Sequence, residues 1–237
     1  MSGNDHKVAI VTGGSQGIGA GLVDGYRDQG WAVAANALTM KPSHDRDLLT
    51  VEGDVSQAAT ADRIVAEALE RFGHIDTLIN NAGVFISKPF TDYTADDYAT
   101  AVGVNLTGFF WLTQRAIAEM LKGDGGHVVN ITTTLVDHAS SEVPAALAAL
   151  TKGGLAAATR SLAIEYASRG IRVNAVSPGV IQTPMHADED DEAQAKLSPI
   201  GSVGHVSDIV NGVLFLESSP YVTGETVHID GGQIAGH

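Results

Sequence analysis

The sequence contains no cysteine. That absence excludes disulfide bonds, thiolate metal ligands and a cysteine nucleophile. Basic residues are also few, since 14 Lys and Arg stand against 28 Asp and Glu and give a formal net charge of −14. Nucleic acids and anionic membranes bind proteins through clustered Lys and Arg. We therefore expect neither as a partner.

Long hydrophobic runs are missing as well. No stretch approaches the roughly 18 apolar residues of a membrane-spanning helix, and residues 1–7 contain no signal-like apolar segment. A cytoplasmic protein is therefore expected. The nine histidines are scattered without the paired spacing that metal ligands show, so the sequence predicts no metal site.

The 237 residues have the apolar and charged fractions of an ordinary globular protein, 44% and 18%, and are predicted to form one domain over 1–237. Short apolar runs alternate with segments of helical periodicity. The predicted strands are 8–11, 31–36, 48–51, 75–79, 127–131, 171–176 and 226–229, and the predicted helices are about 17–29, 58–72, 95–122, 144–168 and 206–216. This alternation predicts an α/β fold with a doubly wound, Rossmann-like parallel sheet. Residues 37–47 show no helical period and are expected to cross as a loop.

A glycine-rich turn, Thr12-Gly-Gly-Ser-Gln-Gly-Ile-Gly19, joins the first predicted strand to the first helix. Such a turn brings the first N–H groups of the helix to a phosphate, although a close-packed turn without a ligand can need the same glycines. Other chemistry-bearing residues follow later strands, at Asp54, 80–83, 132–134 and 177–183. Ligands of doubly wound sheets bind at those strand ends.

In this order the motifs resemble the short-chain dehydrogenase/reductase family over essentially the whole chain. The resemblance rests on Gly13-x-x-x-Gly17-x-Gly19, Asp54-Val55, Asn80-Asn81-Ala82-Gly83, Asn105, Lys152, 172–179, Thr183-Pro184-Met185 and 222–232. It implies an NAD(P)-dependent oxidoreductase that acts on an alcohol or carbonyl group of a small molecule.

The resemblance also implies which residues form the site. Cofactor contacts are expected from Gly13, Ser15, Gln16, Gly17, Ile18, Gly19, Asp54, Val55, Asn81, Ala82, Gly83, Lys152, Pro178, Gly179, Ile181 and Thr183. Catalytic roles are expected for Asn105, whose family counterpart helps hold a proton-relay water, and for Thr133 and Lys152. Thr133 takes the place of a family serine that hydrogen-bonds the substrate oxygen, and threonine keeps that hydroxyl.

One member of the family's catalytic set is missing. The family's proton donor is a tyrosine four residues before the lysine, one turn away on the same helix face, where the lysine charge lowers the tyrosine pKa. Counting back from Lys152 gives Ala148, and no tyrosine lies between Tyr98 and Tyr166. Three interpretations stay open: an oxidoreductase with another proton source, an inactive nucleotide-binding relative with a scaffolding or regulatory role, and an engineered alanine in an ordinary enzyme.

The first interpretation needs a substitute for the tyrosine. The candidates are a water held by Asn105 and Lys152, or one of the side chains of His138, Glu142 and His186. Each of these three side chains could equally be an exposed loop residue.

Cofactor choice, substrate contacts and assembly follow from smaller features. NAD-selective relatives usually carry an acidic residue at the position that matches about Ala37, and that acid is absent here. NADP-selective relatives usually carry a basic residue at the positions that Gln16 and Leu38 fill in this chain. Lys41 and Arg46 follow in the same loop, so the sequence leans towards NADP over NAD. Residues 177–203 are expected to hold a substrate lid, with ligand contacts from Met185, His186, Leu197 and Ile200. Helices 95–122 and 144–168 resemble those that pair in family tetramers, so a homotetramer or dimer is expected.

Overall fold

The computed structural model describes residues 6–184 and 194–236. Seven strands form one parallel sheet in the order β3-β2-β1-β4-β5-β6-β7. They are β1 (Val8–Thr12), β2 (Ala32–Ala37), β3 (Leu48–Glu52), β4 (Thr77–Asn80), β5 (Gly126–Ile131), β6 (Ile171–Pro178) and β7 (Thr226–Ile229). The chain starts in the middle of the sheet, builds outward to β3, then returns past β1 to β4. The predicted doubly wound α/β fold is confirmed.

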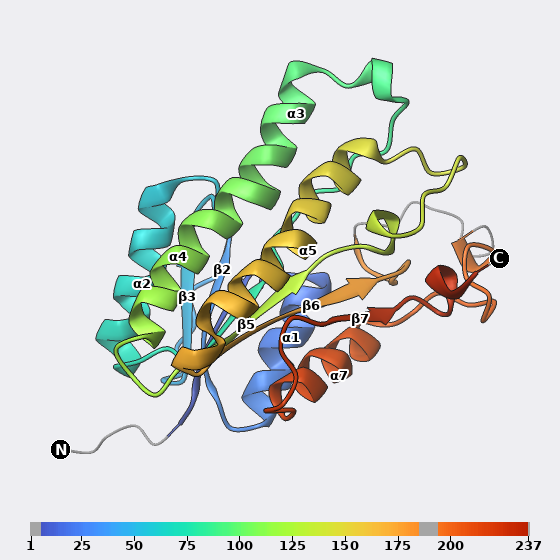
Figure 1. The fold of residues 1–237 in the computed structure, drawn as a ribbon. Coiled ribbons are helices and arrows are strands. Elements are labelled where there is room, and N and C mark those ends of the chain that lie inside the picture. Colours follow the sequence, from blue (N-terminus) through green and yellow to red (C-terminus); the bar gives the residue numbers. More distant parts are fainter. Residues whose placement is uncertain (1–5, 185–193, 237) are drawn as a thin grey trace.

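Helices cover both faces of the sheet (Figure 1). One face carries α1 (Gly17–Asp28) and α7 (Val206–Glu217). The other carries α2 (Ala58–Phe72), α4 (Gly108–Met120) and α5 (Ala146–Tyr166). Short helical segments complete the list: Phe90–Asp92, α3 (Ala95–Ala101), Val102–Thr107, Thr134–Val136, Ala167–Arg169 and Gln233–Ala235.

The sheet holds its helices through two apolar layers. Every residue of β1 and β2 is buried, as expected for strands covered on both faces. Side chains that alternate along the strands point into the two layers. The helices contribute Leu22 and Val213 to the layer on one face of the sheet, and Ile64 and Leu112 to the layer on the other. Burial of this continuous apolar surface, at roughly 25 cal/mol per Å², supplies the main stabilisation of the fold.

The predicted continuous helix over 95–122 is wrong in one respect. Between α3 and α4 the chain forms a π-helical segment, Val102–Thr107, in which the Gly108 N–H donates to the carbonyl of Gly103. This turn contains one residue more than an α-helical turn, and the spacing of apolar residues in the sequence does not reveal the extra residue.

Other element bounds differ slightly from the prediction. The helix expected from Pro144 begins at Ala146, and strand limits differ by one or two residues, which is the usual uncertainty of helix and strand ends. Residues 177 and 178, assigned in advance to the lid, belong to β6. Residues 38–47 cross as a loop, so the prediction for 37–47 is confirmed except at Ala37, which ends β2. Within the described part of the chain, no helix is long and apolar enough to cross a bilayer.

Candidate active site

A cavity of about 780 Å³ opens at the carboxyl ends of the strands. It lies beside the point where the strand order reverses between β1 and β4, which is where ligands of doubly wound sheets bind. Every residue expected to contact a cofactor lines it: Gly13, Ser15, Gln16, Gly17, Ile18, Gly19, Asp54, Val55, Asn81, Ala82, Gly83, Lys152, Pro178, Gly179, Ile181 and Thr183. The fold therefore gathers these segments around one space, and their individual contacts with a cofactor stay predictions.

The glycine turn forms one side of this cavity. Gly17 has φ +54°, in the left-handed region that favours glycine, and a Cβ on Gly19 would lie 2.0 Å from the carbonyl oxygen of Gly13. The turn therefore keeps its shape only with these glycines. Helix α1 starts here, and its N-cap residue Gln16 makes no side-chain capping bond. The first N–H groups of α1 are thus available to an anion.

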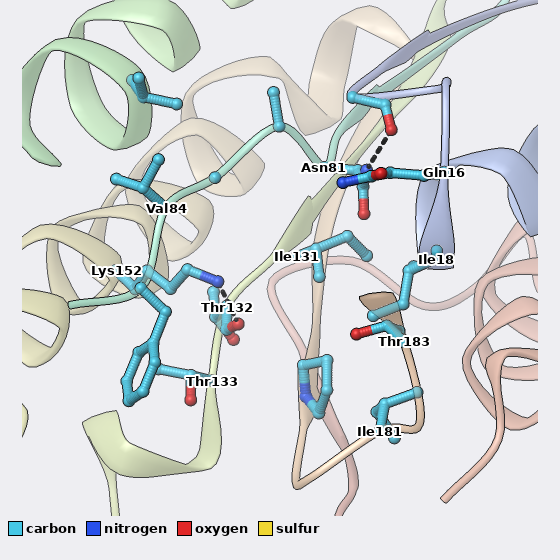
Figure 2. Close-up of a pocket in the computed structure, with 18 of the residues that line it drawn as sticks. Gln16, Ile18, Asn81, Val84, Ile131, Thr132, Thr133, Lys152, Ile181 and Thr183 are labelled. Carbon is cyan, nitrogen blue, oxygen red and sulfur yellow. Dashed lines mark hydrogen bonds between the residues drawn. The ribbon is translucent and has the colours of Figure 1, made fainter. Parts of the chain in front are cut away.

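Thr12 and Asn81 tie this turn to the end of β4. The Thr12 hydroxyl donates to the carbonyl of Ile79 and accepts from the backbone N–H groups of Asn81 and Ala82, both at 3.0 Å. In return the Asn81 amide donates to the carbonyl of Thr12 at 2.8 Å. Asn81, predicted as a cofactor contact, therefore also fixes the turn against its neighbouring strand (Figure 2).

Three consecutive threonines follow β5 and differ in how their hydroxyls are used. Thr132 donates to the carbonyl of Val176 at 3.1 Å, and Thr134 donates to the carbonyl of Pro178 at 2.8 Å. Thr133 only accepts, from the Leu135 N–H at 3.5 Å. Within the described structure, Thr133 is thus the member of the run whose hydroxyl hydrogen has no acceptor, and it lines the cavity. It can donate a hydrogen bond to a ligand oxygen.

Lys152 extends from α5 to the same part of the cavity (Figure 2). Its ammonium donates to the backbone carbonyl of Thr132 at 3.0 Å. Among the described residues no carboxylate forms an ion pair with it. Burial without a counter-charge lowers the pKa of Lys152 to about 8, because the low-dielectric surroundings disfavour its charged form.

Asn105 lies in the π-helical segment, just behind the cavity wall, and is 2% exposed. Its Oδ1 accepts from the Val84 N–H at 2.9 Å, and its Nδ2 donates to the Val84 carbonyl at 3.1 Å and to the Thr151 hydroxyl at 3.0 Å. Both amide donors are therefore occupied in joining the loop after β4 to α5, next to Lys152. The predicted role with a catalytic water stays a prediction, and the observed role is positioning.

Ala148 lies one turn before Lys152 on α5. It is 2% exposed and is not among the residues that line the cavity. The titratable side chains on the described wall are Asp54, Glu142 and Lys152, without a tyrosine or a histidine.

The remaining sequence candidates divide. Glu142 and Leu197 line the cavity, whereas His138 does not. The expectation for Ile200 is wrong, because this side chain is 74% exposed and lies outside the cavity wall. Met185 and His186 lie outside the described residues. Sequence reasoning missed several lining residues that have no recognisable pattern of their own: Val84, Phe85, Ser87, Thr100, Val104, Ile131, Leu135, Val143 and Gln233.

Comparison with known proteins agrees with this geometry. The profile of the family described as enoyl-(acyl carrier protein) reductase matches residues 13–233. The 3beta-hydroxysteroid dehydrogenase 1 of Eggerthella lenta is 34% identical over 95% of this chain and 93% of its own length.

Two solved structures superpose closely. ElxO with NADP bound has a TM-score of 0.90 and 25% identity, covering 98% of this chain and all of that chain. The 3-ketoacyl-(acyl-carrier-protein) reductase of Brucella melitensis complexed with NADH has a TM-score of 0.89 and 27% identity, covering 96% and 98% of the two chains. With the glycine turn, the strand-end motifs and the strand order, these matches identify the chain as a member of the short-chain dehydrogenase/reductase family of oxidoreductases.

Proposed function

We propose that this protein is an NAD(P)-dependent oxidoreductase that acts on a carbonyl or alcohol group of a small molecule without a tyrosine proton donor. The observation that carries the proposal is a cavity with a phosphate-type glycine turn on one side and Thr133 with Lys152 on the other (Figure 2). Bound NAD(P) supplies or accepts the hydride exchanged with the substrate carbon.

The chain's own residues divide the remaining work. The uncapped N–H groups of α1 and the turn at Gly13–Gly19 hold the diphosphate. Asp54 and Val55 lie at the adenine end, and Ile181 and Thr183 at the nicotinamide end. Lys152 binds the nicotinamide ribose, and the free hydroxyl of Thr133 donates to the substrate oxygen. Asn105 keeps the loop after β4 and α5 in register.

The missing tyrosine does not argue against cofactor binding. A variant of ElxO in which a tyrosine is replaced by phenylalanine carries NADPH in its structure, with a TM-score of 0.90 to this chain. One protein of this fold thus holds the cofactor with a tyrosine hydroxyl removed. Cofactor binding alone therefore does not distinguish an active enzyme from the inactive, scaffolding interpretation, and turnover does.

The test titrates NADPH fluorescence with the protein, then follows NADPH absorbance with a panel of ketones and alcohols. Gly19→Ala is expected to weaken NADPH binding at least tenfold, because the new Cβ collides with Gly13. Gly123→Ala is the matched control, since a Cβ there meets nothing closer than 3.9 Å. Absence of NADPH and NADH binding would refute the proposal. Binding without turnover, in the native chain and in Ala148→Tyr, would favour the inactive interpretation.

We propose NADP as the preferred cofactor. Support comes from the end of β2, where the two residues that line the cavity, Ala37 and Leu38, have no carboxylate of their own for the adenosine ribose hydroxyls. The expectation that Arg46 serves a 2′-phosphate is wrong, because Arg46 lies just before β3 at the amino ends of the strands, where its carbonyl accepts from the Arg71 guanidinium. Parallel titrations should give a lower Kd for NADPH than for NADH, and a lower Kd for NADH would contradict this preference.

We also propose that the protein forms a homotetramer or dimer through α4 and α5. Phe110 on α4 and Leu150 and Ile164 on α5 are 52%, 60% and 80% exposed, and the two helices lie side by side on one face (Figure 1). Apolar side chains gathered on neighbouring helices favour association. Sedimentation at micromolar concentration should give an oligomer, and Ile164→Arg should shift it towards monomer.

A further inference from the structure

The cavity contains few groups that could give a proton to a substrate. On the described wall the titratable side chains are Asp54, Glu142 and Lys152. Asp54 follows β3, at the far end of the cavity, and its Oδ1 already accepts from the Ser56 N–H at 2.9 Å. Glu142 is exposed on the loop before α5. Lys152 is the remaining acid.

The surroundings of Lys152 leave protons free for transfer. An ammonium carries three N–H donors, and one of them is engaged, on the Thr132 carbonyl at 3.0 Å. The elements packed around it contribute neutral groups, namely the amide of Asn105, the hydroxyl of Thr151 and the backbone of Gly83, whose missing Cβ would meet the Lys152 Cε at 3.6 Å. Two N–H bonds therefore remain for the cavity.

The position of Lys152 relative to Thr133 suits a carbonyl oxygen. Lys152 is bound to the backbone of Thr132, and Thr133, the next residue, keeps a free hydroxyl on the same wall. Figure 2 shows the Lys152 ammonium beside Thr132, with Thr133 as the next residue along the same wall. Burial lowers the pKa of Lys152 to about 8, and a general acid works best when its pKa lies near the operating pH.

We propose that Lys152 itself is the general acid and base of this enzyme, taking over the work of the missing tyrosine. The inference rests on the proposed function. In the reduction direction the hydride of NAD(P)H forms the new C–H bond at the carbonyl carbon, and the carbonyl π electrons move to oxygen. An N–H bond of the Lys152 ammonium breaks, and its proton forms the O–H bond of the alcohol. NAD(P)+ and a neutral lysine amine remain, and solvent returns the proton to the amine.

The first test observes the lysine without turnover. Lysine side chains are labelled with ¹³C, and the Lys152 signal is assigned by its loss in Lys152→Arg. We expect this signal to titrate with a midpoint near pH 8, about two pH units below the usual value for lysine. A midpoint above pH 10 overturns the inference, whatever the enzyme does with substrates.

The second test separates cofactor binding from proton transfer. Lys152→Arg keeps the positive charge, but a guanidinium does not release its proton near neutral pH. We expect its NADPH Kd to change less than tenfold and its reduction of ethyl acetoacetate, or of the best ketone of the panel, to fall by 10² to 10⁴. Lys122→Arg, at an exposed ion pair with Glu119, is the matched control and should keep the native rate.

The outcomes separate the two proposals. If native protein and Lys152→Arg reduce the ketone within tenfold of each other, the lysine inference fails and the proposed function stands. If the native protein binds no NAD(P)H, or binds it and turns over nothing, the proposed function fails and the inference falls with it. A native reduction rate that declines as pH rises through about 8, with no such decline for NADPH binding, is the expected profile.

Discussion

Glu217 tests how the end of α7 is held against the sheet. It ends α7 and reaches the amino ends of the strands, at the opposite side of the sheet from the cavity. Its Oε2 accepts from the hydroxyls of Tyr26 and Thr77 at 2.9 and 3.0 Å, and from the Nδ1 of His127 at 3.1 Å. Burial raises the pKa of Glu217, but these bonds, that of His127 foremost, lower it more, so the folded state holds the carboxylate ionised.

The substitution Glu217→Gln keeps the size of the side chain and removes its charge. A hydrogen bond to a charged group contributes about 1.5–3 kcal/mol, and a buried donor left without a partner costs about 1–3 kcal/mol. The glutamine oxygen has two lone pairs for the three donors, and Arg172, whose Nη2 lies 4.0 Å from Glu217, loses its counter-charge. We expect the free energy of unfolding to fall by about 2–4 kcal/mol.

Urea denaturation followed by circular dichroism at pH 7.5 measures this loss, with protein concentration held fixed because the proposed association would contribute to stability. Glu70→Gln is the control: Glu70 is exposed on α2, and its substitution should change stability by less than about 0.5 kcal/mol. A loss below about 1 kcal/mol for Glu217→Gln would refute the reasoning. The three hydrogen bonds would then stabilise the fold no more than the bonds that the same groups make with water in the unfolded chain.

Three further predictions concern single residues. Stability should fall as pH drops below about 6.5, because burial lowers the pKa of His127, so the unfolded chain binds a proton there that the folded chain does not. Urea denaturation curves from pH 7.5 to 5 should show this loss of stability, and His127→Gln should reduce it. Asn105→Ala should cost about 1–3 kcal/mol, since the part-buried N–H and carbonyl of Val84 and the buried hydroxyl of Thr151 lose their partner, and should lower kcat more than it raises the NADPH Kd; equal effects on both would count against a positioning role. Ala148→Tyr should destabilise the fold by about 1–3 kcal/mol, because a 2% exposed site offers no room for a phenol ring, and an unchanged Tm would contradict this.

The strands and the edge of the sheet that carries the cavity could be expected from the sequence because both depend on local signals. Each buried parallel strand is a short apolar run, and each is followed by polar or glycine residues that parallel geometry collects at one edge. The turn at 12–19 and the motif at 80–83 were found this way. Their spatial neighbours were not, because Val84 and Phe85 join the wall only through the path of a loop, which no periodicity encodes.

The partners of the polar residues were beyond sequence reasoning for a different physical reason. Glu217 stands at the end of an amphipathic helix, where a charged residue is usually solvated. Its contact with Tyr26 joins residues 191 positions apart, so it depends on the completed sheet rather than on any local preference. The same holds for Asn105, which meets Val84 and Thr151 only because the π-helical segment turns its amide inward.

The Lys152 ammonium that serves the proposed acid role also lowers the stability of the folded chain. Its pKa lies at about 8 instead of 10.5, so below pH 8 the folded chain bears the cost of a poorly solvated charge, and one pKa unit corresponds to about 1.4 kcal/mol. Lys152→Met removes that cost and loses one hydrogen bond, to Thr132. We expect a gain in unfolding free energy of up to about 2 kcal/mol at pH 7, together with loss of ketone reduction. Native stability should rise as pH increases from 8 towards 10.5, where the unfolded chain alone keeps this proton, and the methionine variant should lack that rise. A destabilised Lys152→Met would show that the ammonium is well solvated or paired when the chain is folded, and would remove the physical basis for treating it as an acid.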